Sequence, residues 1–195
     1  MKSKIILKKQ FKNKVVLITG HTGFKGSWLS AWLSLMGAKI IGVSLDKRGK
    51  KSHLNYLKFI KMHKDYRFDI SDYKKIKNCI AKSKPDFVFH LAAQSLVGNA
   101  YENPLFTWKS NSTGTINVLN ALRFLKKKCT AVIITSDKCY KNLEIKRGYV
   151  ESDILGGIDP YSASKASAEI AFKSYFETFL KKKKNIKEFH VEQEM

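Results

Sequence analysis

The sequence predicts an α/β fold in which a doubly wound parallel sheet is built from alternating strands and helices. The apolar, β-branched run V-V-L-I-T ends at a turn that contains three glycines, and the residues after this turn repeat apolar side chains at helical intervals. The same strand-then-helix order recurs along the chain. With 195 residues and 44% hydrophobic composition, the chain is long enough to bury the core of one domain.

The first strand is predicted at residues 14–19 and the first helix at residues 26–36, joined by the motif G-H-T-G-F-K-G. Such glycines suit a dinucleotide site, because they permit a tight turn, a close backbone approach to the pyrophosphate and close helix-to-strand packing. The helix N-terminus adds unpaired N–H groups and the positive end of the helix dipole. The cofactor contacts predicted in this turn are Gly20, Thr22, Gly23, Phe24, Lys25 and Gly26.

A second strand, predicted at residues 39–45, ends at Asp46, which follows Gly26 by 20 residues. At this spacing a dinucleotide-binding unit places an acid that accepts hydrogen bonds from the adenosine ribose and repels a 2′-phosphate. Lys47 and Arg48 partly offset that repulsion. An ordinary turn with a solvated acid is the alternative, but the order of strand, glycine turn, helix, strand and acid favours a site for NAD rather than NADP.

The alternation continues to residue 180. Further strands are predicted at residues 66–70, 86–91 and 130–135, and further helices at 73–82, 105–125 and 161–180, with a short helix within 47–64. Asp72 is expected to cap the helix that follows it. Ligands of parallel sheets bind at the carboxyl ends of the strands. The strand ends therefore add the predicted cofactor contacts Asp69, Ile70, Leu91, Ala92 and Ala93.

The segment Y-S-A-S-K places Tyr161 and Lys165 four residues apart, on one face of a helix. A nearby cation stabilises a phenolate, which lowers the pKa of the tyrosine toward the range in which it acts as a base on a sugar hydroxyl. Ser136, which arrives at the end of the fifth strand, could hydrogen-bond the same hydroxyl. The Y-x-x-x-K spacing also occurs by chance, but together with the glycine turn it predicts a catalytic pair.

Charge, cysteine content and hydropathy limit the classes of binding partner that are expected. The net charge of +21 comes almost wholly from lysines spread along the chain. Because proteins usually recognise nucleic acids through arginine side chains, no nucleic-acid partner is expected. The three cysteines lack a C-x-x-C spacing, which predicts reduced thiols and no metal site. Without a long apolar run or a signal-like N-terminus, a cytoplasmic protein with no membrane partner is expected.

Four segments together carry a family resemblance: G-H-T-G-F-K-G-S-W-L, H-L-A-A-Q, T-S-D-K-C-Y and D-P-Y-S-A-S-K. They resemble the CDP-glucose 4,6-dehydratases of the extended short-chain dehydrogenase/reductase superfamily, with a Rossmann-like sheet, over about residues 14–180. The H-T-G-F-K-G and S-D-K-C-Y segments separate this branch from the dTDP-glucose and GDP-mannose dehydratases and from the UDP-sugar epimerases.

The resemblance implies a bound NAD that is reduced and reoxidised within each turnover of CDP-glucose. Tyr161, assisted by Lys165 and Ser136, would deprotonate the C4 hydroxyl, and Asp137 would protonate the departing C6 hydroxyl. Lys138 occupies the place where dTDP-glucose dehydratases carry a glutamate base, which leaves the C5 base open. Asn111 matches a structural or active-site asparagine, and is assigned here to the cofactor site.

The resemblance also implies parts that this chain is expected to lack. Family members continue beyond the helix with Tyr161 into a sixth strand with R-A-G-N-V, further sheet and a substrate lobe. The chain is therefore interpreted as a basic lead-in at residues 1–13, a dinucleotide-binding domain at 14–180 and a basic tail at 181–195, with an exposed apolar sheet edge. One codon choice for residues 190–195 encodes R-G-A-G-N in another frame, so a frameshift is our hypothesis for the tail, and the gene sequence tests it.

Two other functions remain open at this point. One is another NAD-dependent nucleotide-sugar epimerase or dehydratase, since an epimerase needs no acid for the C6 hydroxyl. The other is a non-catalytic dinucleotide-binding module. The superfamily resemblance further suggests a homodimer formed through the helices predicted at residues 105–125 and 161–180.

Overall fold

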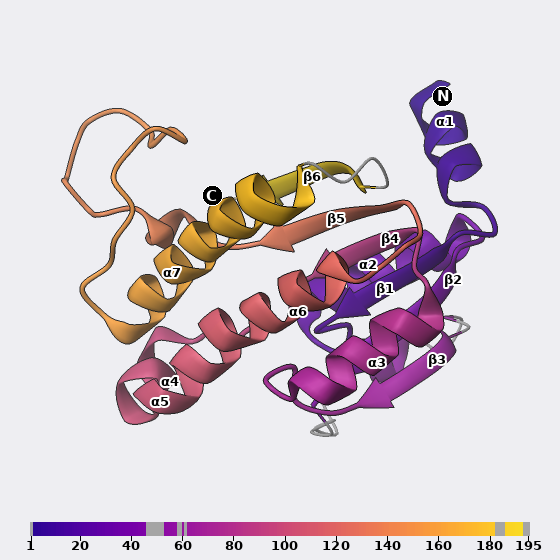
Figure 1. The fold of residues 1–195 in the computed structure, drawn as a ribbon, viewed down its shortest axis with the longest axis horizontal. Helices are drawn as coiled ribbons and strands as arrows, with labels where there is room; N and C mark the ends of the chain where they lie inside the picture. Colours follow the sequence, from indigo (N-terminus) through magenta and orange to yellow (C-terminus); the bar gives the residue numbers. More distant parts are fainter. Residues whose placement is uncertain (1, 46–52, 58–59, 61, 182–185, 193–195) are drawn as a thin grey trace.

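The computed structural model describes residues 2–45, 53–57, 60, 62–181 and 186–192, which form a six-stranded sheet in the order β3-β2-β1-β4-β5-β6 (Figure 1). All neighbouring strands are parallel. The order reverses between β1 and β4, so the sheet is doubly wound and the predicted fold class is confirmed. The strands are β1 Val15–Thr19, β2 Lys39–Ser44, β3 Met62–Arg67, β4 Phe87–His90, β5 Cys129–Ile134 and β6 Ile186–Glu192.

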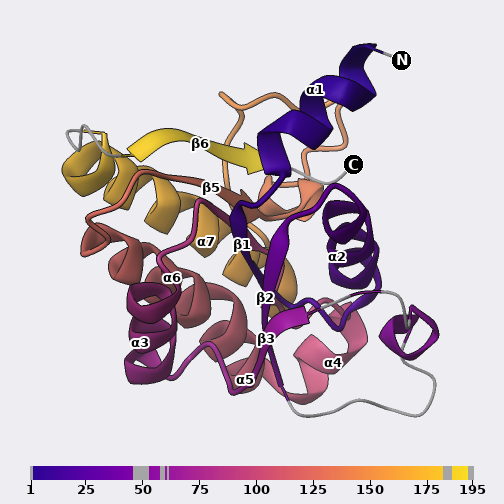
Figure 2. The same ribbon diagram turned by 90° about the vertical axis from the view of Figure 1, so that its right-hand side faces the viewer.

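Helices cover both faces of the sheet. Figure 2 shows the sheet nearly edge-on, with α2 on one face and α3, α6 and α7 on the other. The helices are α1 Lys2–Phe11, α2 Phe24–Leu35, α3 Tyr73–Ser83, α4 Val97–Glu102, α5 Pro104–Trp108, α6 Gly114–Arg123 and α7 Pro160–Tyr175. Short turns add η1 His53–Tyr56, η2 Lys109–Thr113, η3 Asp137–Cys139 and η4 Phe176–Leu180.

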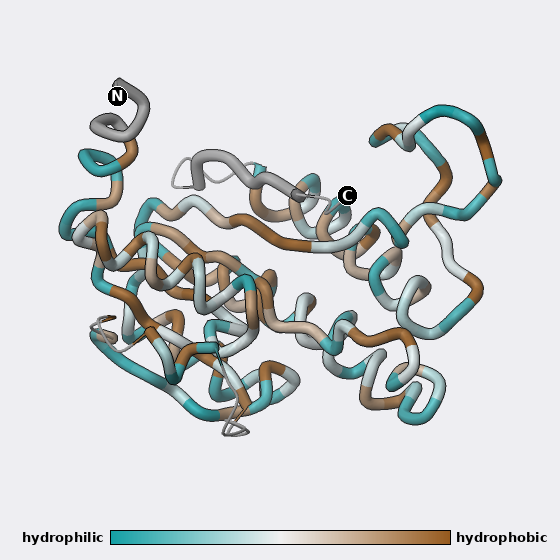
Figure 3. Tube along the Cα trace, turned by 180° about the vertical axis from the view of Figure 1, so that it is seen from behind, coloured by the Kyte–Doolittle hydropathy of each residue, from teal (hydrophilic) through white to brown (hydrophobic). Residues whose placement is uncertain are grey.

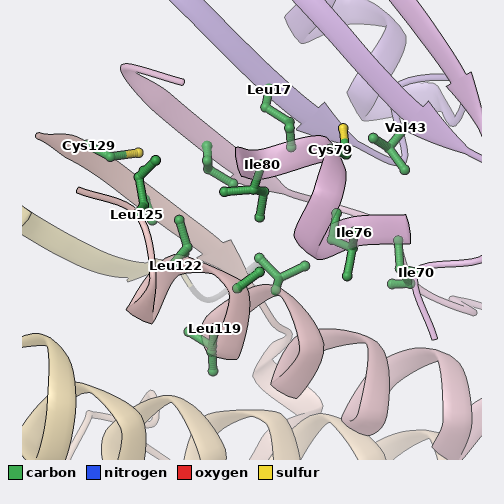
Figure 4. Packing of buried hydrophobic residues seen from close by; sticks show 14 of the residues in the cluster. Leu17, Val43, Ile70, Ile76, Cys79, Ile80, Leu119, Leu122, Leu125 and Cys129 are labelled. Atoms are coloured by element: carbon green, nitrogen blue, oxygen red, sulfur yellow. The ribbon is translucent and has the colours of Figure 1, made fainter. Parts of the chain in front are cut away.

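The core consists of two main clusters, one on each face of the sheet. Along β1, Leu17 packs into the larger cluster with α3 and α6, whereas Val16 and Ile18 pack into the cluster beside α2. Both faces of a parallel strand are covered, which explains why its sequence is apolar throughout rather than alternating. Figure 4 shows the larger cluster, in which Ile76 and Leu119 are fully buried. Figure 3 shows hydrophobic residues along the central strands.

Local signals set several element ends as expected. The predicted cap of α3 is confirmed, since Asp72 Oδ1 accepts a hydrogen bond of 3.1 Å from the Lys75 amide. Gly37, at φ +83°, ends the segment after α2 in the left-handed conformation that glycine tolerates. The loop then leads directly into β2, which pairs in register with β1 from Lys39 onward.

Other elements differ from the prediction. The lead-in forms α1, whose last residue, Phe11, packs against Phe87 with ring centroids 4.8 Å apart. The third strand runs over Met62–Arg67 rather than 66–70, because its backbone pairs with β2 through a segment whose centre, His63, Lys64 and Asp65, is exposed and carries no apolar signal. The long helix predicted at 105–125 is divided into α5, the π-helical turn η2 and α6, and α4 precedes it.

The C-terminal segment also differs. No strand is predicted from the sequence after the helix that carries Lys165, but β6 pairs with β5, and Ala131 lies opposite Phe189. β5 is therefore an interior strand, and the edge predicted to be exposed there is covered by β6. The charged residues within I-K-E-F-H-V-E are typical of a solvated tail. The segment forms a strand because the backbone N–H and C=O groups along β5 need hydrogen-bond partners.

Within the described ranges, no helix is long and apolar enough to cross a membrane. The same residues contain no cluster of three or more His, Cys, Asp or Glu side chains that could hold a metal ion. Cys79, Cys129 and Cys139 are buried free thiols, and burial is the main reason that each has a pKa raised to about 12.

Candidate functional site

A cavity of about 480 Å³ lies at the carboxyl ends of the central strands, where the strand order reverses. It contains most of the predicted cofactor contacts, together with the predicted catalytic pair. From those predictions it is lined by Gly20, Thr22, Gly23, Phe24, Lys25, Gly26, Asp69, Ile70, Leu91, Ala92, Ala93, Tyr161 and Lys165. The further lining residues are Ser44, Leu45, Phe68, Ser95, Ser110, Ile134 and Thr135.

The glycine turn is packed so closely that no side chain fits at Gly20 or Gly26. Gly20 has φ +75°, and a Cβ atom there would lie 2.8 Å from the Ala92 nitrogen. A Cβ on Gly26 would lie 2.2 Å from the Gly20 carbonyl oxygen. This packing places the N-terminus of the twelve-residue helix α2 at the cavity. The turn therefore fits the pyrophosphate of a dinucleotide, which needs bare backbone and a helix N-terminus.

His21, within the same turn, points away from solvent and is fully buried. Its Nε2 atom lies 3.1 Å from Asp65 Oδ1 on β3, and Asp65 also pairs with Arg67. Arg67 in turn donates a hydrogen bond of 2.7 Å to the Ser44 hydroxyl, at the cavity edge. Gly42 leaves room for the imidazole, since a Cβ there would lie 2.6 Å from the ring. These contacts anchor the glycine turn to β2 and β3.

Asp46, the acid predicted to contact the adenosine ribose, lies outside the described residues, as do the neighbouring Lys47 and Arg48. The preference for NAD over NADP therefore stays a prediction. The described end of β2, at Ser44 and Leu45, does line the cavity.

The end of β4 is held by a buried chain of hydrogen bonds. His90 Nδ1 lies 2.7 Å from the Thr19 hydroxyl, and its Nε2 lies 3.0 Å from the Thr115 hydroxyl. Thr115 donates to the Asn111 carbonyl oxygen, so it must accept from a protonated Nε2. Burial, reinforced by the charge of Lys165, lowers the pKa of His90 to about 3. His90 is therefore a neutral structural link between the ends of β1 and β4.

Asn111 lies in the π-helical turn η2 and is 2% exposed. Its side chain accepts a hydrogen bond of 2.8 Å from the Gln94 amide, and its Nδ2 donates to the Gln94 carbonyl oxygen at 3.0 Å and to the Ser164 hydroxyl at 2.9 Å. It does not line the cavity, although Ser110 beside it does. These contacts support a structural role, in which Asn111 ties the segment after β4 to α7.

Tyr161 and Lys165 enter the cavity from the first two turns of α7. Both are buried, and Lys165 Nζ lies 3.4 Å from the Ile134 carbonyl oxygen at the end of β5. Asp159 begins the helix: its Oδ1 accepts hydrogen bonds from the Tyr161 amide at 2.9 Å and from the Ser162 amide at 3.0 Å. The orientation of the Tyr161 backbone therefore depends on this cap.

Replacing Asp159 by Ala is expected to lower the free energy of unfolding by about 1 kcal/mol near neutral pH, the usual cost of losing an N-cap. Burial favours the neutral acid, but hydrogen bonds from Ser162 and Tyr161 outweigh it and hold the pKa of Asp159 below its ordinary value. A lowered folded-state pKa stabilises the protein above the unfolded pKa and ceases to do so as the pH falls through the folded value.

Urea titrations at several pH values check this prediction. The difference between Asp159→Ala and the unsubstituted protein should shrink as the solution becomes acidic. Asp159→Asn keeps a cap acceptor and serves as the matched control, with a smaller loss at neutral pH. An alanine variant that is as stable as the unsubstituted protein would contradict the assigned role.

After β5, Ser136 caps the turn η3, which contains Asp137 and Lys138 and packs against α7. The Ser136 hydroxyl donates to Asp137 Oδ1 at 3.0 Å and accepts from the Lys138 amide at 3.3 Å. Lys138 lines a second cavity of about 520 Å³, which also contains Asp159 and Ser162. The three predicted catalytic residues thus lie at the strand end beside the helix of Tyr161, and their roles stay predictions.

Several residues of the site were not predicted from the sequence. Ser44, Phe68 and Thr135 line the cavity because they stand at the ends of β2, β3 and β5. Thr135 is the last residue of the strand predicted at 130–135 but was not predicted as a contact, whereas Phe68 lies inside the strand predicted at 66–70 and stands at a strand end only because β3 ends at Arg67. Glu169, a buried residue that accepts a hydrogen bond from the Thr135 hydroxyl, carried no signal beyond its position eight residues after Tyr161.

Comparison with known proteins agrees with this geometry. A model of the family described as GDP-mannose 4,6 dehydratase matches residues 17–192. A CDP-glucose 4,6-dehydratase of Salmonella typhimurium is 42% identical over 175 residues, which cover 90% of this chain and 49% of that protein. A dTDP-D-glucose 4,6-dehydratase of Dictyostelium discoideum is 32% identical, over 84% of this chain and 41% of the relative. The chain spans about half the length of the curated relatives it matches.

Solved structures share the fold. An epimerase of Methanothermobacter thermautotrophicus superimposes with a TM-score of 0.77 at 25% identity, covering 97% of this chain and 53% of the other. A UDP-glucose 4-epimerase of Brucella ovis, solved in complex with NAD, gives a TM-score of 0.75 at 22% identity, over 92% and 51% of the two chains. The second likeness shows the arrangement of the sheet and its helices alone.

Proposed function

This chain belongs to the GDP-mannose 4,6-dehydratase family, and on that premise we propose that it is the dinucleotide-binding part of an NAD-dependent CDP-glucose 4,6-dehydratase. The product would be CDP-4-keto-6-deoxyglucose. The observation that carries the proposal is that one cavity is lined both by the closely packed glycine turn and by Tyr161 and Lys165. The 42% identity to the Salmonella CDP-glucose enzyme supports CDP-glucose as the substrate.

The cavity supplies the contacts that NAD requires. Gly20, Gly23 and Gly26, with the N-terminus of α2, would hold the pyrophosphate, and the small residues Ala92 and Ala93 would leave room for a flat ring. NAD held by these residues would supply the hydride chemistry, in which the hydride leaves the sugar C4 and is returned to C6. All other steps fall to side chains of this chain.

In the proposed reaction, Tyr161 takes the proton of the C4 hydroxyl while the C4 hydrogen leaves as hydride. Lys165 stabilises the phenolate, and Ser136 hydrogen-bonds the reacting hydroxyl. The new 4-keto group acidifies the C5 proton, and water then departs across C5 and C6, with the proton for the leaving hydroxyl supplied by Asp137. Lys138 stands next to this acid and is the candidate to take the C5 proton and to return it to C5 when the hydride reaches C6.

The test has two stages. First, titration of the 195-residue chain with NAD, followed by calorimetry, should show one binding site. Second, this chain and a version extended to the full length of its curated relatives should each be incubated with CDP-glucose, dTDP-glucose, UDP-glucose and GDP-mannose. A product one water lighter from CDP-glucose supports the proposal. Turnover of UDP-glucose alone would indicate an epimerase, and NAD binding without turnover in either version would favour the binding-module alternative.

The proposal includes a homodimer. It is supported by exposed apolar side chains on the two neighbouring helices α5 and α7, of which Leu105 is 81% and Ile170 is 58% exposed. Large exposed apolar residues that share one surface are typical of protein interfaces. Sedimentation of the purified chain tests this part separately from turnover.

A further inference from the structure

Lys165 and Glu169 are the only Lys, Arg, Asp or Glu side chains that are buried within the part of the chain that the structure describes, with exposed fractions of 6% and 8%. They stand four residues apart on α7 and therefore share one face of the helix. Burial of a charge is costly unless an opposite charge and hydrogen bonds accompany it. The proposed catalytic role of Lys165 explains why a lysine is buried there, but the proposed reaction gives Glu169 no function.

Both side chains reach the end of the same strand. Lys165 Nζ donates to the Ile134 carbonyl oxygen at 3.4 Å, and Glu169 accepts a hydrogen bond from the Thr135 hydroxyl. Ile134 and Thr135 are consecutive residues, and Ser136 follows them directly. The ammonium and the carboxylate are therefore both held at the end of β5, next to the proposed catalytic turn.

The charges of Lys165 and Glu169 also shift the pKa values of neighbouring titratable groups. Burial, followed by the negative charges of Glu169 and Asp137, raises the pKa of the Cys139 thiol to about 12, and the positive charge of Lys165 opposes this increase. Burial and the charge of Lys165 lower the pKa of His90 to about 3. The Lys165 and Glu169 charges thus act on the same buried thiol, on η3, and Lys165 also acts on the imidazole of β4.

We propose that Glu169 is a positioning residue whose carboxylate is the buried counter-charge that keeps Lys165 protonated beside the end of β5. A lysine buried without such a partner loses its proton at a much lower pH than a solvated one. Without Glu169, the ammonium that would stabilise the Tyr161 phenolate would lose its proton at a lower pH. The charge pair itself does not depend on the proposed function; only its consequence for Tyr161 rests on that function.

The first test is the pH dependence of stability in Glu169→Gln, a substitution that keeps an acceptor for Thr135 and removes the charge. Its Lys165 should have a folded-state pKa below the unfolded value of about 10.4. The unfolded state then binds more protons, so the stability of the variant rises with pH between those two values. Relative to the unsubstituted protein, its unfolding equilibrium constant should fall at least roughly tenfold from about pH 8 to pH 10.4, which corresponds to one pKa unit.

Controls isolate Lys165 as the group that titrates. Thr135→Val removes the hydrogen bond but keeps both charges, and its loss of stability should be the same at every pH. In the folded protein the pKa values of His90 and Cys139, about 3 and 12, lie outside this range, and the titration of the unfolded Cys139 thiol and of Asp137 is common to all variants. The series is repeated in a Tyr161→Phe background, which removes the phenol's own titration.

A second test applies if Glu169→Gln fails to fold. Lys165→Met leaves a buried carboxylate unpaired, whereas Lys165→Met with Glu169→Gln removes both charges. The double variant should fold and should be more stable than Lys165→Met alone, a coupling that a double-mutant cycle detects. The proposal is overturned if the double variant is no more stable, or if the deficit of Glu169→Gln does not change with pH. Neither test requires NAD or a sugar, so failure of the proposed function is seen separately.

Discussion

Replacing Tyr161 by Phe is expected to slow the oxidation of the CDP-glucose C4 hydroxyl by roughly 10²- to 10⁴-fold, the contribution of a positioned general base. The substitution removes one hydroxyl from a ring that is 8% exposed and lines the cavity, so the shape of the site is kept while the base is lost. Single-turnover measurements of nicotinamide reduction report this step directly. They require the version of the protein that turns over CDP-glucose.

Tyr101→Phe is the matched control, because Tyr101 is 66% exposed on α4 and does not line the cavity. Its rate should equal that of the unsubstituted protein. The thermal midpoint of Tyr161→Phe, measured in parallel, separates a lost base from a misfolded site. A Tyr161→Phe rate within about threefold of the unsubstituted rate, far short of a general base's contribution, would assign the base elsewhere.

Replacing Gly26 by Ala is expected to lower the free energy of unfolding by about 3 kcal/mol, the upper end of the usual cost of overpacking. The new Cβ would lie 2.2 Å from the Gly20 carbonyl oxygen and 2.8 Å from the Cα of His21. Both contacts are to backbone, so no side-chain rotation relieves them. The turn must open, which moves the N–H groups of α2 away from the pyrophosphate, and NAD binding should be lost. Urea unfolding and calorimetric titration with NAD measure the two effects.

Gly98→Ala provides the comparison at a glycine that is also helical. No atom lies within 4 Å of a Cβ built on Gly98, near the start of α4. Because alanine is the better helix former, this variant should gain up to about 1 kcal/mol of stability. Equal effects at Gly26 and Gly98 would show that the close packing of the glycine turn does not govern stability.

The candidate site was largely visible in the sequence because its parts are local. The apolar run before Gly20 and the helical spacing after it placed the turn, and the Y-x-x-x-K spacing placed Tyr161 and Lys165 on one helix face. Knowledge that strand ends gather at one edge of a parallel sheet was then sufficient to bring Ala92 into the same cavity. Residues whose contacts lie far away in the chain gave no such signal, as Glu169 and Thr135 show.

The alternation of strands and helices, the glycine turn and the spacing of the Tyr–Lys pair could all be predicted from the sequence, since backbone period and turn chemistry depend on neighbouring residues. Only the tertiary structure decided that residues 186–192 cover β5, that Asn111 binds Gln94 and Ser164, and that the buried charges of Lys165 and Glu169 meet one strand end. These contacts join segments far apart in the chain. They form because buried backbone and charged groups must find partners once the layers are packed.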